Sequence, residues 1–313
     1  MKSRNLRVQI LTILQKNLNF VSGAKLAEKL NVSRVTIWKH IKKLKEKGYP
    51  IEITKKGYKL LMNKDIIFED KLKELPYKVY YFQEVTSTMD IAREKAENEE
   101  KALILAETQT SGKGRLARMW YSPPGGIWMS LIIKPDLNLK ESYILTYIAS
   151  ISTALAIKDI TGLKVKLKWP NDVVYEEKKL AGILLEIRAE VDKIQYAIIG
   201  IGINVNNKIS NLETQAISLK EIFKKDISRT DIIINLVKYF DKFIKKNSNE
   251  ILKSWKEMSC TLGREVKILT TQEIIKGIAF DLSEDGALMI KDKFGNVHKI
   301  YSGDCIHLRK IEK

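Results

Sequence analysis

A glycine-rich, basic stretch at residues 108–120 constrains this chain more than any other part of its sequence. It follows the apolar run 102–106, which predicts a buried strand. Gly112 and Gly114 allow backbone N–H groups to come close to a ligand. Fixed positive charge comes from Lys113, Arg115 and Arg118. The stretch therefore predicts a loop that binds an anion, either a phosphate or a carboxylate.

Two phosphate-binding patterns can be compared with this loop. The P-loop pattern G-x-x-x-x-G-K-[ST] does not fit it. Gly112, Gly114 and Ala117 match the dinucleotide pattern G-x-G-x-x-[GA], but that pattern has to open a helix. Residues 121–126 follow at once and contain two prolines and two glycines, so a helix cannot continue. A Rossmann site is therefore excluded, although charge alone fits a solvated surface loop equally well.

Four further segments accompany the loop. One lies upstream, at residues 86–90, and three lie downstream, at residues 168–172, 179–184 and 200–206. In this order and spacing, the five segments resemble the biotin–protein ligase family, over roughly residues 65–313. The basic loop looks like the family's biotinyl-adenylate loop. The N-terminal part extends the resemblance to the bifunctional ligases that also repress the biotin operon.

Positive charge is concentrated at the N-terminus. The chain carries a formal charge of +17, and residues 1–62 account for +12 of it, with 15 Lys/Arg against 3 Asp/Glu. Such a concentration indicates a module that binds a polyanion.

Residues 1–62 read as a winged helix-turn-helix. The pattern predicts a first helix at about 6–18, a second at 23–30 that Ser22 caps, and a third that runs from the cap Ser33 to about Lys47. Asn31 suits the left-handed turn between the second and third helices. The wing is a hairpin at residues 51–60. The third helix offers apolar residues to the core: Val35, Ile37, Ile41 and Leu44. Its solvent face offers residues to DNA: Ser33, Arg34, Thr36, Lys39 and Lys43.

The rest of the chain predicts two more domains. Strands and helices alternate through residues 65–258, and Thr230 or Asp231 caps a helical stretch that ends near Ser259. Short, evenly spaced strands then fill residues 262–313. We expect an α+β multidomain protein: a winged helix-turn-helix at 1–62, a central mixed α/β domain of the biotin/lipoate ligase type at 65–258, and an SH3-like C-terminal β-barrel at 262–313.

Composition excludes several classes of protein. Cys260 and Cys305 cannot form a disulfide framework and lack metal-ligand spacing, so they read as reduced packing thiols. The three histidines have no diagnostic partners, so no metal site built from Cys or His is predicted. No run approaches 18 apolar residues, so no membrane span and a cytoplasmic location are expected.

The resemblance implies a two-step reaction. The family joins the carboxylate of biotin to AMP from ATP, with Mg²⁺, and then passes biotin to a lysine of a carrier domain. The implied partners are a biotin carboxyl carrier protein, operator DNA and a second copy of the chain in a ligand-induced homodimer.

Site residues are carried over position by position. The expected biotin contacts are Ser87, Thr88, Met89, Gln109, Gly112, Lys113, Gly114, Arg115 and Lys179. The expected nucleotide contacts are Arg118, Trp120, Asn171, Gly202 and Asn204. The expected catalytic residues are Lys179, Arg115, Arg118 and Asp172.

Three of these positions carry qualifications. Many family members have Asn where this chain has Met89, so only a backbone contact is expected there. Lys113 replaces the more usual Arg and keeps the charge without bidentate geometry. Asp172 either holds a metal or assists deprotonation of the acceptor lysine.

Two other functions remain open at this point. One is a DNA-binding biotin sensor without ligase activity, although a sensor need not keep Lys179, the basic loop and Asn204. The other is a lipoate–protein ligase, which is related in fold. The segments 112–118 and 168–172 together favour biotin.

Overall fold

The computed structural model describes residues 2–17, 19–46, 49–61, 66–209 and 215–308. The chain divides into two compact units. The first comprises Met1–Leu75 with Ser228–Thr230, and the second comprises Pro76–Ile227 with Asp231–Lys313. The predicted boundary between residues 62 and 65 lies outside the described residues.

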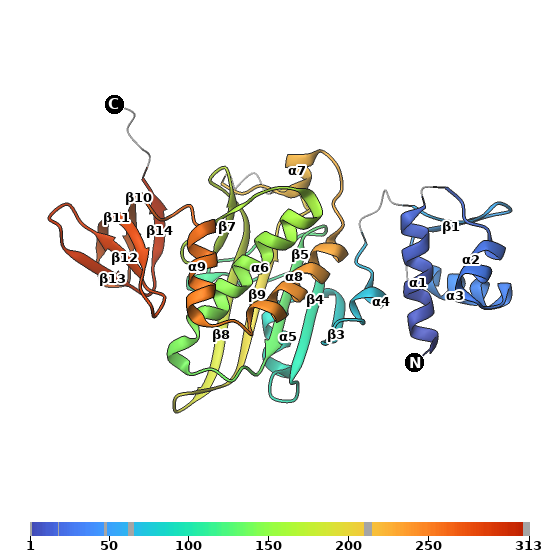
Figure 1. Cartoon of the computed structure of the whole chain (residues 1–313), viewed down its shortest axis with the longest axis horizontal. Helices are drawn as coiled ribbons and strands as arrows, with labels where there is room; N and C mark the ends of the chain where they lie inside the picture. The colour runs from blue at the N-terminus through green and yellow to red at the C-terminus, as the bar shows by residue number, and fades with distance from the viewer. Residues whose placement is uncertain (1, 18, 47–48, 62–65, 210–214, 309–313) are drawn as a thin grey trace. The chain divides into compact units, whose positions relative to one another are not determined.

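The described part of the first unit, through residue 75, contains four helices and a hairpin (Figure 1). Ser22 accepts a hydrogen bond from the backbone N–H of Lys25, and Asn31 adopts a left-handed φ of 50°, which confirms both predicted turn residues. The helices are α1 (Lys2–Lys16), α2 (Gly23–Leu30), α3 (Arg34–Glu46) and the short α4 (Glu69–Leu72). The hairpin is β1 (Ile51–Thr54) and β2 (Gly57–Leu60), paired antiparallel.

One core prediction for α3 is wrong. Ile37, Ile41 and Leu44 are buried in the core of the first unit, but Val35 is 62% exposed. The buried residues follow the i, i+4, i+7 spacing of one helix face. Val35 lies two residues before Ile37 and therefore points to the opposite side of the helix. Its neighbour on that side, Trp38, is 50% exposed.

The helical region near residue 230 also differs from the prediction. It forms two helices, α8 (Arg229–Phe243) and α9 (Ser248–Met258), rather than one. Thr230 lies inside α8 and does not cap it, because its hydroxyl accepts the backbone N–H of Phe68 at 2.8 Å. Asn247 caps α9 by accepting the N–H of Glu250.

A seven-stranded sheet forms the centre of the second unit, in the order β3-β4-β5-β9-β8-β7-β6. The β3/β4 pair is parallel and the other neighbours are antiparallel. The strands are β3 (Lys78–Val85), β4 (Lys101–Gln109), β5 (Ile127–Ile133), β6 (Lys166–Lys168), β7 (Asp172–Tyr175), β8 (Lys178–Glu190) and β9 (Lys193–Ile203). The sequence did not predict β7, which begins two residues after Pro170.

Helices cover this sheet. α5 (Thr88–Lys95) packs on it through a buried cluster that includes Met89, Ala92 and Ala96. α6 (Tyr143–Thr161) and α9 pack against each other and lie over the sheet (Figure 1). By length and composition, the segment 139–161 could cross a membrane, but 67% of its apolar window is buried, as in a core helix.

The C-terminal part is a five-stranded antiparallel sheet in the order β13-β12-β11-β10-β14. Its strands are β10 (Arg264–Leu269), β11 (Ile274–Leu282), β12 (Leu288–Lys291), β13 (Val297–Ile300) and β14 (Asp304–His307). The turn after β11 reaches α6, because the Tyr147 hydroxyl donates to the carbonyl of Gly286 at 2.7 Å.

Candidate active site

The basic loop leaves β4 and folds back on itself. The backbone N–H of Trp120 donates to the carbonyl of Gly112 at 2.8 Å, and the N–H of Gly114 donates to the carbonyl of Arg118 at 2.8 Å. A Cβ atom on Gly112 would lie 2.3 Å from the Trp120 carbonyl oxygen, so this crossing requires glycine. Leu116, in the short η1 turn (Arg115–Ala117), has a left-handed φ of 55°. The loop is thus a compact turn that carries its cations close together.

A cavity of about 560 Å³ lies beside this loop. Apart from Gly112, every residue that the sequence predicted for the biotin, nucleotide and catalytic positions lines it. These are Ser87, Thr88, Met89, Gln109, Lys113, Gly114, Arg115, Arg118, Trp120, Asn171, Asp172, Lys179, Gly202 and Asn204. Segments that lie far apart in the sequence therefore meet at one place.

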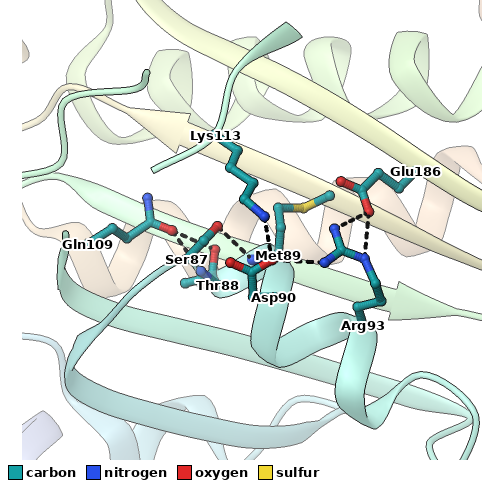
Figure 2. A network of polar contacts seen from close by, with 8 residues as sticks. All are labelled: Ser87, Thr88, Met89, Asp90, Arg93, Gln109, Lys113 and Glu186. Atoms are coloured by element: carbon teal, nitrogen blue, oxygen red, sulfur yellow. Dashed lines mark hydrogen bonds and ion pairs between the residues drawn. The ribbon is translucent and has the colours of Figure 1, made fainter. Parts of the chain in front are cut away.

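A polar network fixes one wall of the cavity. The side-chain oxygen of Gln109 accepts both the backbone N–H of Thr88 at 2.8 Å and its hydroxyl at 3.0 Å (Figure 2). The amide nitrogen of Gln109 donates to Ser122 at 2.8 Å, and the hydroxyl of Ser130 donates to that of Thr88 at 2.9 Å. The network ties the N-terminus of α5, which Ser87 caps, to the far end of the basic loop.

Ser122 and Ser130 are members of this network that sequence reasoning missed. Ser130 interrupts an otherwise apolar strand, and a lone hydroxyl at a buried position requires a partner. That interruption was the available signal. Met89, by contrast, buries its side chain, since a Cβ on Gly200 would lie 2.6 Å from its sulfur.

Lys113 belongs to a second network. Its ammonium lies 2.5 Å from Asp90 Oδ1, and the same oxygen accepts a hydrogen bond from Arg93 at 2.8 Å (Figure 2). Arg93 also forms an ion pair with Glu186 at 2.7 Å. Partial burial acts to raise the pKa of Asp90, but the hydrogen bonds from Lys113 and Arg93 outweigh it and lower that pKa.

The two loop arginines contact the C-terminal sheet. Arg115 donates to Asn171 Oδ1 at 3.2 Å and to the carbonyl of Gly303 at 3.2 Å. Arg118 forms an ion pair with Asp304. Burial lowers the pKa of Arg115, although Asp304 and Asp172 oppose this effect, and a guanidinium stays charged. Sequence reasoning missed Gly303 and Asp304, which lie far from the loop in the chain.

Lys179 and Asp172 face each other. Lys179 Nζ lies 2.7 Å from Asp172 Oδ1 and 5.1 Å from the centre of the Trp120 ring. Asp172 Oδ1 has no aligned hydrogen-bond donor among the described residues, so the contact with Lys179 is ionic. The Lys179 backbone is held by the Gln215 carbonyl, which accepts its N–H at 2.6 Å.

The Trp120 ring packs against two glycines. A Cβ on Gly202 would lie 2.5 Å from Trp120 Nε1, and one on Gly182 would lie 3.0 Å from the ring. Gly182 and Gly202 are cross-strand partners in the β8/β9 pair. The Trp120 Nε1 is buried without a hydrogen-bond partner among the described residues. The glycine pair therefore makes room for the indole ring.

The two predicted asparagines already have partners. Asn171 donates its amide to the carbonyl of Ile183 at 2.7 Å, in addition to its contact with Arg115. Asn204 accepts a hydrogen bond from Asn207 at 3.0 Å and is buried. Their contacts with a nucleotide stay predictions.

The described part of the chain contains no group of three or more His, Cys, Asp or Glu side chains that could hold a metal ion. Asp172 is the carboxylate in the cavity beside Lys179. One or two carboxylates together with substrate phosphates are a usual way of holding Mg²⁺, so this donor set fits Mg²⁺ that is bound mainly by phosphate.

The exposed face of α3 is a second candidate site. Ser33 accepts the N–H of Thr36 and caps the helix, as predicted. Of the five residues predicted to face DNA, Ser33, Arg34, Lys39 and Lys43 are exposed and Thr36 is partly buried. They lie on the same helix as exposed Val35 and Trp38.

Known families match three successive parts of the chain. Residues 7–59 match the HTH domain, residues 79–204 match the biotin/lipoate A/B protein ligase family, and residues 261–308 match the biotin protein ligase C-terminal domain.

Whole proteins match as well. The bifunctional ligase/repressor BirA of Bacillus subtilis is 33% identical over 93% of this chain and 94% of its own length. BirA of Escherichia coli is 27% identical over the full length of both chains. The biotin protein ligase of Aquifex aeolicus, solved in complex with biotin and ATP, is 31% identical. It aligns with a TM-score of 0.64 over 74% of this chain and 99% of that chain. This chain therefore belongs to the biotin–protein ligase family, among the bifunctional ligase/repressor proteins.

Proposed function

We propose that this chain is an ATP-dependent biotin–protein ligase that also represses transcription by binding operator DNA. In the first step, a biotin carboxylate oxygen attacks the α-phosphorus of ATP, and pyrophosphate leaves. In the second step, the amine of an acceptor lysine attacks the acyl carbon of biotinyl-5'-AMP, and AMP leaves. The observation that carries the proposal is the gathering of Lys113, Arg115, Arg118 and Lys179 around one cavity.

The reaction needs these cations because its reactants repel each other. The biotin carboxylate and the phosphates of ATP are all negative, and they react only when positive charges and N–H dipoles are already in place. Arg115 contacts Asn171, and Lys179 contacts the adjacent residue Asp172. We infer that these two cations and Arg118 stabilise the charge that develops during adenylation.

Biotin is assigned to the wall formed by residues 87–89 and Gln109. Hydroxyl and amide groups there can pair with the ureido ring, which would otherwise be buried without partners. Gln109 and Thr88 already satisfy each other, so their orientations are set before biotin binds. The nucleotide is assigned to the part of the cavity next to Trp120, Asn171, Gly202 and Asn204.

Asp172 has one of two roles in this proposal. It either accepts the proton of the acceptor lysine or contributes an oxygen to Mg²⁺ that arrives with ATP. Its ion pair with Lys179 keeps it next to this lysine in the wall of the cavity in both cases. Mg²⁺ would supply further positive charge to the phosphates.

The direct test is to mix the protein with ATP, MgCl₂, labelled biotin and a biotin carboxyl carrier domain. We expect covalent label on the carrier that depends on ATP. A parallel reaction with labelled lipoate in place of biotin should give no label. Label from lipoate alone would indicate a lipoate–protein ligase. No label from either acid would indicate a biotin sensor without ligase activity.

The repressor role has its own test. We propose that the helix-turn-helix binds operator DNA, that the protein acts in the cytoplasm, and that bound biotinyl-5'-AMP favours a homodimer. A ligand can control DNA binding only if it favours one state over another, and a two-fold dimer would match paired half-sites. Sedimentation at micromolar protein should show a dimer with biotin and ATP. A monomer under both conditions would count against the repressor role.

A further inference from the structure

The ion pair between Lys113 and Asp90 joins the basic loop to α5. Asp90 is the third residue of this helix, and its backbone N–H donates to the carbonyl of the cap residue Ser87 at 3.1 Å. The carboxylate therefore stands on a fixed backbone. The ammonium of Lys113 ends a flexible four-carbon side chain, so Lys113 is the partner that loses conformational freedom when the ion pair forms.

Asp90 lies outside the cavity that Lys113 lines. Lys113, Ser87, Thr88 and Met89 are among the lining residues, and Asp90 is not. The carboxylate thus contacts the ammonium without lining the cavity itself. A lysine ammonium has three N–H donors, so one contact with Asp90 does not exhaust it.

Arg93 and Glu186 keep Asp90 in place. Arg93 donates to the same Asp90 oxygen that Lys113 contacts, and it pairs with Glu186 at 2.7 Å on β8 (Figure 2). The four side chains carry two positive and two negative charges. The network is therefore neutral as a whole, and Arg93, a residue of the same helix, also holds Asp90.

Apolar side chains contribute little to holding the tip of the loop. Leu116 is 62% exposed and Met119 is 77% exposed, so neither anchors it by apolar burial. Lys113 also lies between two glycines, which raise the entropy of an untethered backbone. Backbone hydrogen bonds hold Gly112 and Gly114 within the loop, and the N–H of Ser111 donates to the Thr86 carbonyl at 2.8 Å. The ion pair with Asp90 adds a side-chain contact between Lys113 and α5.

We propose that Asp90 is a positioning residue for biotin binding, which fixes the Lys113 ammonium at the edge of the cavity and holds the first half of the basic loop against α5. This inference rests on the proposed function. It assigns Asp90 a role through Lys113 rather than through contact with a substrate. It also accounts for a lysine at this position, since the carboxylate supplies the orientation that a planar guanidinium would supply by its own geometry.

The test compares Asp90→Asn, Lys113→Ala and the double variant in the full chain. We expect Asp90→Asn to raise the KM for biotin about three- to fivefold, the scale of one partly exposed ion pair, and to change kcat by less than about twofold. The double variant should have the same KM as Lys113→Ala, because Asp90 acts only through Lys113. The effect of Asp90→Asn should also shrink in high salt.

Glu97→Gln is the matched control. It breaks an ion pair of similar length, between Glu97 and Arg188, that lies away from the cavity. The KM of Glu97→Gln for biotin should equal that of the unaltered chain. An unchanged KM in Asp90→Asn, or effects of the two single changes that multiply in the double variant, would overturn the proposal.

A second measurement does not depend on ligation. Trypsin should cleave after Lys113 several times faster in Asp90→Asn than in the unaltered chain, without biotin or ATP. Equal cleavage rates would refute the docking of Lys113 by Asp90, whatever the activity. If the unaltered chain failed to ligate biotin, the proposed function would fall, and faster cleavage in Asp90→Asn would still support the tether.

Discussion

Lys179 Nζ and Asp172 Oδ1 lie 2.7 Å apart on the β7/β8 hairpin. Lys179 pairs with Val174, which is two residues from Asp172 and therefore on the same face of the sheet. The hairpin thus brings a carboxylate and an ammonium to the same cavity, although seven positions separate them in the chain. The Trp120 ring lies next to the ammonium, at 5.1 Å.

Replacing Lys179 with Ala should reduce biotin ligation by at least about 100-fold while the protein still folds. The expected loss is the scale of one preorganised charge at a developing oxyanion. Steady-state ligation measures the loss of activity, and a thermal melt tests whether the variant still folds. Lys178→Ala is the matched control, because this neighbouring lysine is exposed and does not line the cavity. An unchanged rate in Lys179→Ala would remove this residue from the mechanism.

Local features of the helix-turn-helix could be predicted because each depends on a few adjacent residues. Ser22 and Ser33 cap helices, and Asn31 takes the left-handed turn, as the sequence indicates. Val35 was assigned to the wrong side because apolar character alone does not decide which face of a helix is buried. The spacing of Ile37, Ile41 and Leu44 was the better guide.

The cavity was predictable in part. The motifs carry most of its lining residues, since each motif is a short run of sequence. The contacts of Arg118 with Asp304 and of Lys113 with Asp90 were not predictable. They join residues far apart in the chain, and only the folded backbone brings them within reach. The roles of the lining residues toward biotin and ATP stay predictions.

DNA binding should depend on the exposed cations of α3. We expect the double change Arg34→Ala and Lys39→Ala to weaken binding to an operator. If both residues neutralise phosphates, the slope of log K against log salt concentration should become shallower by about two. Fluorescence anisotropy over a range of salt concentrations measures the slope.

The control for DNA binding removes the same charge from the second unit. Lys225 and Lys245 are both exposed there, and changing both to Ala should leave the slope unaltered. Point changes test DNA binding more cleanly than deletion of residues 1–62. Phe68 stacks on Tyr49 with ring centres 5.2 Å apart, and the deletion would expose its ring to solvent. An equal loss of slope in both double variants would mean that α3 is not the recognition surface.

Acidification below neutral pH should weaken the fold through His307. Burial lowers the pKa of this imidazole, although its hydrogen bond with Glu177 acts in the opposite direction. The unfolded chain therefore binds a proton at a higher pH than the folded chain. The stabilisation by the neutral imidazole is complete above the ordinary histidine pKa of about 6.5 and decreases as the pH falls below that value.

His307→Gln should reduce this pH dependence. Glutamine can keep a hydrogen bond with Thr261, which lies 3.1 Å from the imidazole, but it does not titrate. Unfolding free energies measured between about pH 8 and pH 5 should fall less in the variant than in the unaltered chain. Some slope should remain, because burial also lowers the pKa of His40. Identical slopes would show that His307 does not titrate differently on folding.

The basic loop should be protected from trypsin by biotin and ATP together. Without them it is held by ion pairs of Lys113 and Arg118 and by polar contacts of Arg115, all of which are partly exposed. Like charges on these three residues repel, and exposed Leu116 and Met119 add little apolar anchoring. An anion in the cavity would neutralise the cations, and loop closure would exclude water from a hydrolysable anhydride. We expect cleavage after Lys113, Arg115 and Arg118 in the unliganded protein and clearly slower cleavage with both substrates.

The wing of the helix-turn-helix provides an internal control for the trypsin experiment. Lys55 and Lys56 are exposed in the turn between β1 and β2, in the first unit, and do not line the cavity. Mass spectrometry of the fragments gives the rate at each bond in the same sample. Protection of the loop bonds, with an unchanged rate at the wing, would support closure over the adenylate. Equal rates at the three loop bonds with and without substrates would mean that this loop does not close over the reaction.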